Sequence, residues 1–95
     1  MNNLTGQWAV VTGASKGIGA GIAEALVADG AHVLLVARNQ GDLDAAAERL
    51  RASARGDQEI RTEVADVADR GSVRQLLEVV AGLPALNVFV ANVGT

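Results

Sequence analysis

Hydrophobic residues gather in short runs along the chain, and longer segments with helical spacing separate them. Apolar runs occupy Trp8–Thr12, His32–Ala37 and Leu86–Ala91. Over Ile60–Ala65 apolar residues alternate with residues that are mostly charged. Runs of this length rich in Val and Leu are typical of strands buried on both faces of a parallel sheet, whereas period-two alternation is typical of a half-exposed strand. The pattern therefore predicts four strands, the third lying at a sheet edge.

Three segments between these strands carry apolar residues at three- and four-residue spacing, which predicts three amphipathic helices. Asn39 and Asp69 are placed to cap the second and third helices, and Gly30 follows the first helix, which we expect to end near Asp29. The predicted buried residues are Ile18, Ile22, Ala25 and Leu26 in the first helix, Leu43, Ala46, Ala47, Leu50 and Ala54 in the second, and Val73, Leu76, Leu77 and Val80 in the third.

The alternation of strand and helix is typical of right-handed βαβ units, so the predicted fold is α/β, a doubly wound parallel sheet. The expected strand order is 3-2-1-4. In such a sheet the winding direction reverses between the first and fourth strands, and ligands bind in the crevice at the carboxyl ends of these strands. A binding site is therefore expected after Thr12 and after Ala91.

Composition narrows the class of protein. The chain has 95 residues, 49% of them hydrophobic and 20% charged, which fits one small globular domain. The net charge of −3 argues against nucleic acid or an anionic membrane as a partner, and the absence of cysteine excludes disulfides and thiolate chemistry. With no basic-then-apolar leader and no apolar run near the length of a membrane span, we expect a cytoplasmic protein. We identify no metal-ligand cluster.

A glycine-rich turn follows the first strand and opens the first helix. Its spacing is Gly13-x-x-x-Gly17-x-Gly19, which is neither the G-x-G-x-x-G fingerprint nor a Walker loop. Glycines let main-chain N–H groups come close to a phosphate, and the positive end of the helix dipole faces the charge. The turn therefore predicts a phosphate-binding site, and a tight turn without a ligand is the alternative.

Three segments together resemble the classical short-chain dehydrogenase/reductase family. The stretch Thr12-Gly13-Ala14-Ser15-Lys16-Gly17-Ile18-Gly19 is similar to its T-G-x-x-x-G-x-G turn, Asp66-Val67 to the segment after its third strand, and Ala91-Asn92-Val93-Gly94 to its N-N-A-G segment. Ala91 and Val93 depart from that last pattern, and Val93 adds bulk beside the cofactor. The resemblance implies that residues 1–95 form the cofactor-binding Rossmann half of such an enzyme.

The resemblance also implies individual roles. In the family, the Asp matched by Asp66 contacts the adenine, and the Asn matched by Asn92 flanks the adenosine ribose. Asp66 as a turn cap and Asn92 as a sheet-stabilising residue are the alternatives. The candidate cofactor-binding residues are Gly13, Ser15, Lys16, Gly17, Ile18, Gly19, Arg38, Asn39, Asp66, Val67, Asn92, Val93 and Gly94.

The end of the second strand bears on the choice of cofactor. An acidic residue there accepts hydrogen bonds from the ribose hydroxyls of NAD, whereas an arginine nearby accommodates the 2′-phosphate of NADP. The sequence reads Ala37-Arg38-Asn39, with no acid, and Lys16 in the glycine turn adds a second cation. The cofactor is therefore predicted to be NADP(H); Arg38 as a solvated surface residue is the alternative.

Catalysis is not expected from these residues alone. The family uses Tyr, Lys, Ser and Asn that lie beyond the segment matched by Gly94, and this chain has no Tyr and one Lys, Lys16. The resemblance implies an oxidoreductase that transfers hydride to a carbonyl or from an alcohol, and a full protein that is a homo-oligomer. The fourth strand is apolar on both faces and would be an exposed hydrophobic edge as the last strand, so we expect a remaining catalytic half or a companion chain to cover it. The alternative is a stand-alone, non-catalytic nucleotide-binding or interaction module.

Overall fold

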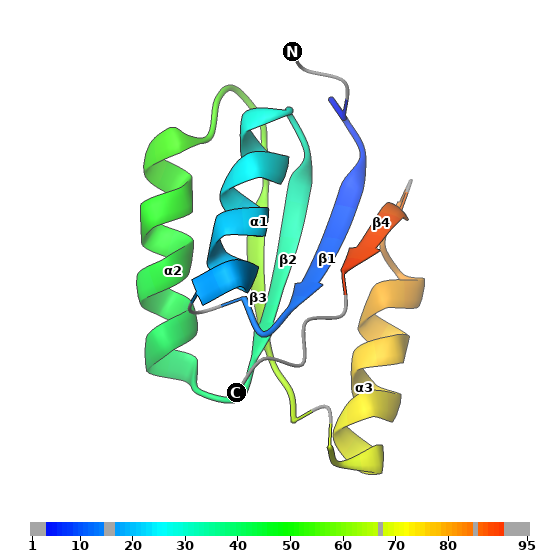
Figure 1. Ribbon diagram of the computed structural model, residues 1–95. Coiled ribbons are helices and arrows are strands. Elements are labelled where there is room, and N and C mark those ends of the chain that lie inside the picture. The colour runs from blue at the N-terminus through cyan, green and yellow to red at the C-terminus, as the bar shows by residue number, and fades with distance from the viewer. Residues whose placement is uncertain (1–3, 15–16, 67, 85, 91–95) are drawn as a thin grey trace.

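A computed structural model describes residues 4–14, 17–66, 68–84 and 86–90. The elements alternate as the sequence predicts: β1 (Trp8–Thr12), α1 (Gly17–Ala28), β2 (His32–Ala37), α2 (Gln40–Ser53), β3 (Ile60–Val64), α3 (Arg70–Ala81) and β4 (Leu86–Val90). Figure 1 shows the strands side by side with helices packed against them. The chain is therefore an α/β unit, and the predicted strands and helices are confirmed to within one or two residues.

The sheet is parallel and its order is β3-β2-β1-β4, as predicted. Trp8 pairs with His32, and Thr12 pairs with Val36, so β1 and β2 end level with each other. Ala37 pairs with Val64, which brings the end of β3 to the same edge. The segments that follow β1, β2 and β3 therefore all leave from the carboxyl edge of the sheet.

Two apolar cores lie on opposite faces of the sheet. Alternate residues of β1 and β2 point to each face because successive side chains of a strand alternate. One core joins Ala9, Val11, Val33 and Leu35 to α1 and α2. The other joins Trp8, Val10, Leu34 and Val36 to α3. Figure 1 shows α1 and α2 together on one side, with α3 apart from them.

The predicted buried face of α1 is wrong for Ile18 and Ala25, whereas Leu26 is partly buried against the core. Gly19, Ala23 and Val27 are the buried residues, whereas Ile18 is 76% exposed and Ala25 is also exposed. The reason is that Glu24 is the one charged residue between Gly17 and Ala28, so hydrophobic spacing cannot distinguish one face of this helix from another. The predicted stripe of α2 is correct for Leu43, Ala46, Ala47 and Leu50.

The third helix follows the prediction in part. Leu76 is buried against the sheet, but Leu77 is 55% exposed. Val73 and Val80 are half-buried. Val79 and Val80 pack partly buried against the same core as Leu76. Among the described residues α3 has one fully buried side chain and α2 has four, so α3 is less deeply packed than α2.

Side chains cap two helices as the sequence predicts. The Asn39 side chain accepts a hydrogen bond from the backbone N–H of Asp42 at 2.9 Å and begins α2. The Asp69 side chain accepts from the N–H of Ser72 at 3.3 Å and begins α3. Each cap satisfies an N–H that the helix itself leaves unpaired.

Trp8 is the largest side chain of the α3-side core and is 2% exposed. Its ring lies 5.0 Å from the His32 ring, and the guanidinium carbon of Arg61 lies 4.7 Å from the Trp8 centroid. The Glu59 carboxylate in turn accepts hydrogen bonds from Arg61. A surface arginine therefore covers the edge of the core by a cation–π contact.

Gly30 ends α1 in a left-handed conformation, with φ of 96°. The N–H of Gly30 donates to the carbonyl of Val27, and the N–H of Ala31 donates to that of Leu26. These two bonds form a Schellman motif, in which glycine is favoured because it tolerates positive φ. The turn directs the chain from α1 into β2.

Gly30→Ala is expected to lower the free energy of unfolding by roughly 1–3 kcal/mol, because alanine is strained at positive φ. A Cβ at Gly30 would also lie 2.7 Å from Oγ1 of Thr5. Urea denaturation followed by circular dichroism measures the change. Gly21→Ala is the control, since a Cβ there meets nothing within 4 Å and should gain about 0.5–1 kcal/mol in helix propensity. Equal stability of the two variants would contradict the left-handed conformation of Gly30 at the end of α1.

Candidate nucleotide-binding site

The glycine-rich turn lies directly after β1, at the carboxyl edge of the sheet. Gly13 has φ of 63° and Gly17 has φ of 59°, both in the region that glycine adopts without strain. The N–H of Ala14 donates to the carbonyl of Val36 at 3.2 Å, so the turn is tied to the last residues of β2. A bound phosphate therefore has to use other N–H groups of the turn than that of Ala14.

The amino end of α1 carries no negative charge in its own first turn. In α2 a side-chain oxygen of Asn39 accepts from the N–H of Asp42, and in α3 a carboxylate oxygen of Asp69 accepts from the N–H of Ser72. The first turn of α1 contains no acidic residue. The positive end of its dipole therefore has no acidic residue within that turn, and this favours an anion. Gly17 begins this helix, and a Cβ built on it would meet nothing within 4 Å.

Arg38 and Asn39 follow β2 at the same edge, and both are exposed. Asn39 lies at the predicted site, but its side-chain oxygen accepts from Asp42, so it acts as a helix cap. No hydrogen bond or ion pair of the Arg38 guanidinium is found within the described residues. A cation without a partner among the described residues therefore lies next to the glycine turn.

Asp66 follows β3 and is half-buried. Its Oδ1 accepts from the N–H of Ala68 at 2.9 Å, which forms a local turn. The neighbouring N–H of Ala65 donates to the carbonyl of Ala37, so Asp66 lies near the residues that end β2. The alternative role of Asp66 as a turn-stabilising residue is thus confirmed, and its contact with adenine stays a prediction.

The structure brings part of the predicted site together. Gly13, Gly17, Arg38 and Asp66 share the carboxyl edge of the sheet. The side chain of Ile18 projects from the first turn of α1 and is largely exposed, and Gly19 is buried. Six candidates lie outside the described residues: Ser15, Lys16, Val67, Asn92, Val93 and Gly94.

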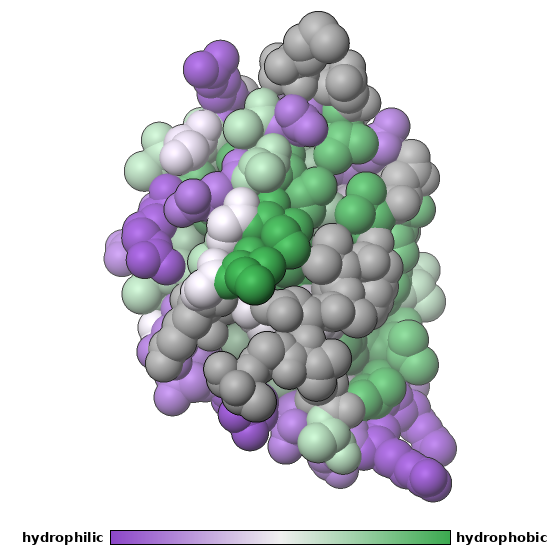
Figure 2. Space-filling model, viewed as in Figure 1, coloured by the Kyte–Doolittle hydropathy of each residue, from purple (hydrophilic) through white to green (hydrophobic). Residues whose placement is uncertain are grey.

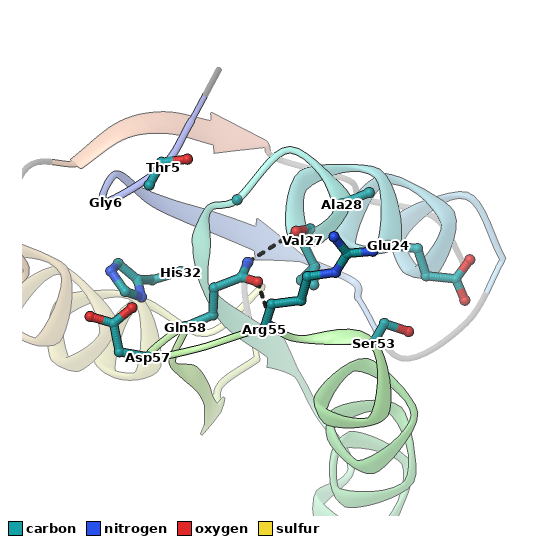
Figure 3. Close-up of a pocket in the computed structure, with 11 residues that line it drawn as sticks. Thr5, Gly6, Glu24, Val27, Ala28, His32, Ser53, Arg55, Asp57 and Gln58 are labelled. Atoms are coloured by element: carbon teal, nitrogen blue, oxygen red, sulfur yellow. Dashed lines mark hydrogen bonds between the residues drawn. The ribbon is translucent and has the colours of Figure 1, made fainter. Parts of the chain in front are cut away.

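A hollow of about 750 Å³ lies at the opposite edge of the sheet, and sequence reasoning did not find it. It is lined by loop residues before β1 and β3 and by the ends of α1 and α2 (Figure 3). The Gln58 amide donates to the carbonyls of Val27 and Ala31 at 3.0 and 2.8 Å, and its oxygen accepts from the N–H of Arg55. Gln58 therefore links the loop before β3 to the end of α1 and to the loop before β2. The hollow is separate from the glycine turn.

A family model described as short chain dehydrogenase matches residues 7–95. The chain belongs to the short-chain dehydrogenase family. This confirms the resemblance that the glycine turn indicates. The glycine turn, the parallel sheet and the order β3-β2-β1-β4 are thus those of a short-chain dehydrogenase. No described helix is long and apolar enough to cross a membrane.

Several known proteins are similar to this chain over nearly its whole length. Senescence-associated protein 13 of Arabidopsis thaliana is 44% identical and is matched over 98% of this chain and 34% of its own length. An uncharacterized oxidoreductase of Mycobacterium tuberculosis is 39% identical over 99% of this chain and 35% of its own. L-sorbose reductase from Gluconobacter frateurii, crystallised with NADPH and L-sorbose, has a TM-score of 0.88 at 35% identity, with 100% of this chain and 36% of that chain covered. The chain thus spans about a third of these relatives.

Proposed function

We propose that the full-length protein is an NADP(H)-dependent oxidoreductase that interconverts a carbonyl and an alcohol, and that this segment holds the cofactor. The observation that supports the proposal most strongly is the glycine turn. Two left-handed glycines lead into a helix whose first turn has no acid, and an arginine without a partner within the described residues lies beside them. The helix end suits the pyrophosphate of a dinucleotide, and the arginine suits the additional 2′-phosphate of NADP(H).

The pyrophosphate is expected to lie at the amino end of α1. Gly17 offers no Cβ on the side where a phosphate approaches, and the helix dipole stabilises its negative charge. In the proposed site Ile18 lies beside the cofactor, where its exposed side chain becomes covered. Lys16 and Ser15 are proposed to contribute from the turn itself, and Asn92, Val93 and Gly94 from the segment after β4.

Arg38 is proposed to bind the 2′-phosphate and so to select NADP(H). The planar guanidinium pairs with phosphate through two parallel hydrogen bonds. Ala37 precedes it and carries no charge that would repel the phosphate. The second oxygen of Asp66, Oδ2, is proposed to accept a hydrogen bond from the adenine amino group. Val67 is proposed to pack beside the same base. L-sorbose reductase, crystallised with NADPH, supports this choice.

The nicotinamide, when bound, exchanges a hydride with the substrate carbon. The residues of this segment anchor and orient the cofactor. The Tyr that exchanges the proton with the substrate oxygen, and the Lys beside it, are proposed to come from the remaining two-thirds of the protein. That part is also proposed to cover β4 and to form a homo-oligomer.

Turnover by the full-length protein tests the proposal. We expect NADPH to be oxidised in the presence of a panel of ketones and aldehydes, which is measured as the loss of NADPH absorbance. NADH at equal concentration should be oxidised more slowly. Binding of NADPH without turnover of any carbonyl or alcohol would instead support a non-catalytic nucleotide-binding module. Absence of binding would contradict the proposed cofactor site itself.

Gly17→Ala and Gly56→Ala form a matched pair for the pyrophosphate site. Both glycines have φ of 59°, and a Cβ on either meets nothing within 4 Å. Each variant should therefore lose about 1–2 kcal/mol of stability from left-handed strain. Gly17→Ala alone is expected to weaken NADPH binding, about tenfold or more, because its methyl group lies where the phosphate approaches. Isothermal titration measures this, and equal affinities for the two variants would remove Gly17 from the site.

A further inference from the structure

Arg38 lies between the end of β2 and the cap of α2, and hydrogen bonds hold the main chain just before it. The carbonyl of Val36 accepts from the N–H of Ala14 at 3.2 Å, and the carbonyl of Ala37 accepts from the N–H of Ala65 at 3.0 Å. The first bond joins the end of β2 to the glycine turn, and the second joins it to the end of β3. The backbone that enters Arg38 is therefore held relative to the proposed cofactor site.

Asn39 holds the main chain on the other side of Arg38. Its side-chain oxygen accepts from the N–H of Asp42 at 2.9 Å, and its carbonyl accepts from the N–H of Leu43 at 3.1 Å. A Cβ built on Gly41 would lie 3.3 Å from the same side-chain oxygen, so the Asn39 side chain lies close against the first turn of α2. Leu43 is fully buried in the core. Asn39 thus links the backbone that leaves Arg38 to a part of α2 that is anchored on the sheet.

The guanidinium of Arg38 takes its position from this backbone. Arg38 is exposed, and no hydrogen bond or ion pair of its guanidinium is found within the described residues. Figure 2 shows hydrophilic side chains at the surface around the amino end of α2, at the lower left, where Figure 1 places that end of the helix. A side chain that no neighbour holds follows the direction of its own Cα–Cβ bond, which the backbone sets. The hydrogen bonds on either side of Arg38 therefore decide where the guanidinium can reach.

We propose that Asn39 is a positioning residue for the choice of cofactor. By capping α2 it holds Arg38 in the orientation that receives the 2′-phosphate of NADP(H), without contacting that phosphate itself. The inference rests on the proposed function, in which Arg38 binds the phosphate. Without the cap the N–H of Asp42 loses its partner and the first turn of α2 frays. The binding orientation of Arg38 is then populated for a smaller fraction of the time, and the apparent dissociation constant for NADPH rises by that factor.

Paired titrations of the full-length protein with NADPH and NADH test the inference. We expect Asn39→Ala to weaken NADPH binding about three- to tenfold and to leave NADH binding within about twofold, because NADH has no 2′-phosphate. Asn39→Ser keeps an oxygen that can cap the helix, and it should bind NADPH within about twofold of the unchanged protein. In an Arg38→Ala background, Asn39→Ala should cause no further loss of NADPH affinity, because a residue that acts through Arg38 has no effect once that side chain is gone.

The cap of α3 supplies the matched control. Asp69→Asn and Asp69→Ala carry the same charge, and they differ in whether a side-chain oxygen remains to accept from the N–H of Ser72. Thermal unfolding should show a lower midpoint for Asp69→Ala than for Asp69→Asn, and likewise for Asn39→Ala than for Asn39→Ser, since each pair differs by one cap. The two Asp69 variants should nevertheless have the same ratio of NADPH to NADH affinity.

Three results would overturn the inference. Unchanged NADPH affinity in Asn39→Ala would show that the cap is not needed to hold Arg38. A loss that persists in the Arg38→Ala background would mean that Asn39 contacts the phosphate directly. A different ratio of affinities in the two Asp69 variants would mean that any lost cap weakens NADPH binding. If Arg38→Ala loses NADPH affinity and Asn39→Ala does not, this inference alone fails; if the unchanged protein binds no NADPH, the proposed function fails and this inference fails with it.

Discussion

Replacing Arg38 with alanine is expected to reduce the affinity of the full-length protein for NADPH by about 10- to 100-fold, since hydrogen bonds to charged groups contribute roughly 1.5–3 kcal/mol. The affinity for NADH should change little, because NADH has no 2′-phosphate. The guanidinium is exposed at the end of β2, where its removal leaves no buried group unpaired. Paired titrations with the two cofactors measure the ratio.

Arg49→Ala is the control for this variant. Arg49 is another exposed arginine, on the outer side of α2, and its removal changes net charge by the same amount. We expect it to leave both affinities close to those of the unchanged protein. If Arg38→Ala and Arg49→Ala behave alike, Arg38 is a solvated surface residue and the preference for NADP(H) has another origin.

Leu43→Ala is expected to lower the free energy of unfolding of the 95-residue chain by about 2–5 kcal/mol, through lost burial and the cavity left behind. Leu43 is fully buried where the first turn of α2 meets the sheet. A domain of this size has a total stability of roughly 5–15 kcal/mol, so the loss is a large fraction of it. Chemical denaturation followed by circular dichroism measures it.

Leu77→Ala removes the same atoms from a residue that is 55% exposed on α3. We expect it to cost under about 1 kcal/mol, because little apolar surface returns to water. Comparable losses for the two leucines would mean that α2 is not packed on the sheet as described. Since Asn39 caps α2 and Arg38 precedes it, such a result would also remove the support for the position of Arg38.

The fold could be predicted because local signals and topology rules agree. Val33 to Val36 form an uninterrupted apolar run, which identifies a strand buried on both faces. Asn39 and Asp69 mark helix starts, and Gly30 marks a helix end, because each supplies a hydrogen bond or a conformation that other residues do not. The order of the strands is that of the doubly wound sheet, which the alternation of strand and helix indicates.

The face of α1 could not be predicted, and the reason is physical. Spacing locates the buried side of a helix by contrast with polar residues, and α1 supplies one polar residue, Glu24. The structure resolves the ambiguity through the small residues Gly19 and Ala23, which let the helix approach the sheet. Ile18, expected in the core, lies at the surface instead.

The candidate site was predictable in its backbone more than in its side chains. Positive φ at Gly13 and Gly17 is what glycine spacing in a strand-to-helix turn indicates. The roles of polar side chains depend on neighbours that the sequence does not identify. Asn39 is occupied as a helix cap and one oxygen of Asp66 is occupied in a turn, and the hollow around Gln58 arises from loops that carry no motif.

Hydrogen–deuterium exchange of the full-length protein with and without NADPH tests the central claim most directly, because it locates the cofactor on the chain. The account predicts slower exchange on binding in peptides that cover Val10–Ala20 and in those that contain Arg38 and Asp66. Peptides from Ser53 to Gln58, at the opposite edge of the sheet, should exchange as before. Protection confined to that opposite edge, or no protection anywhere in these residues, would contradict the assignment of the glycine turn as the cofactor site.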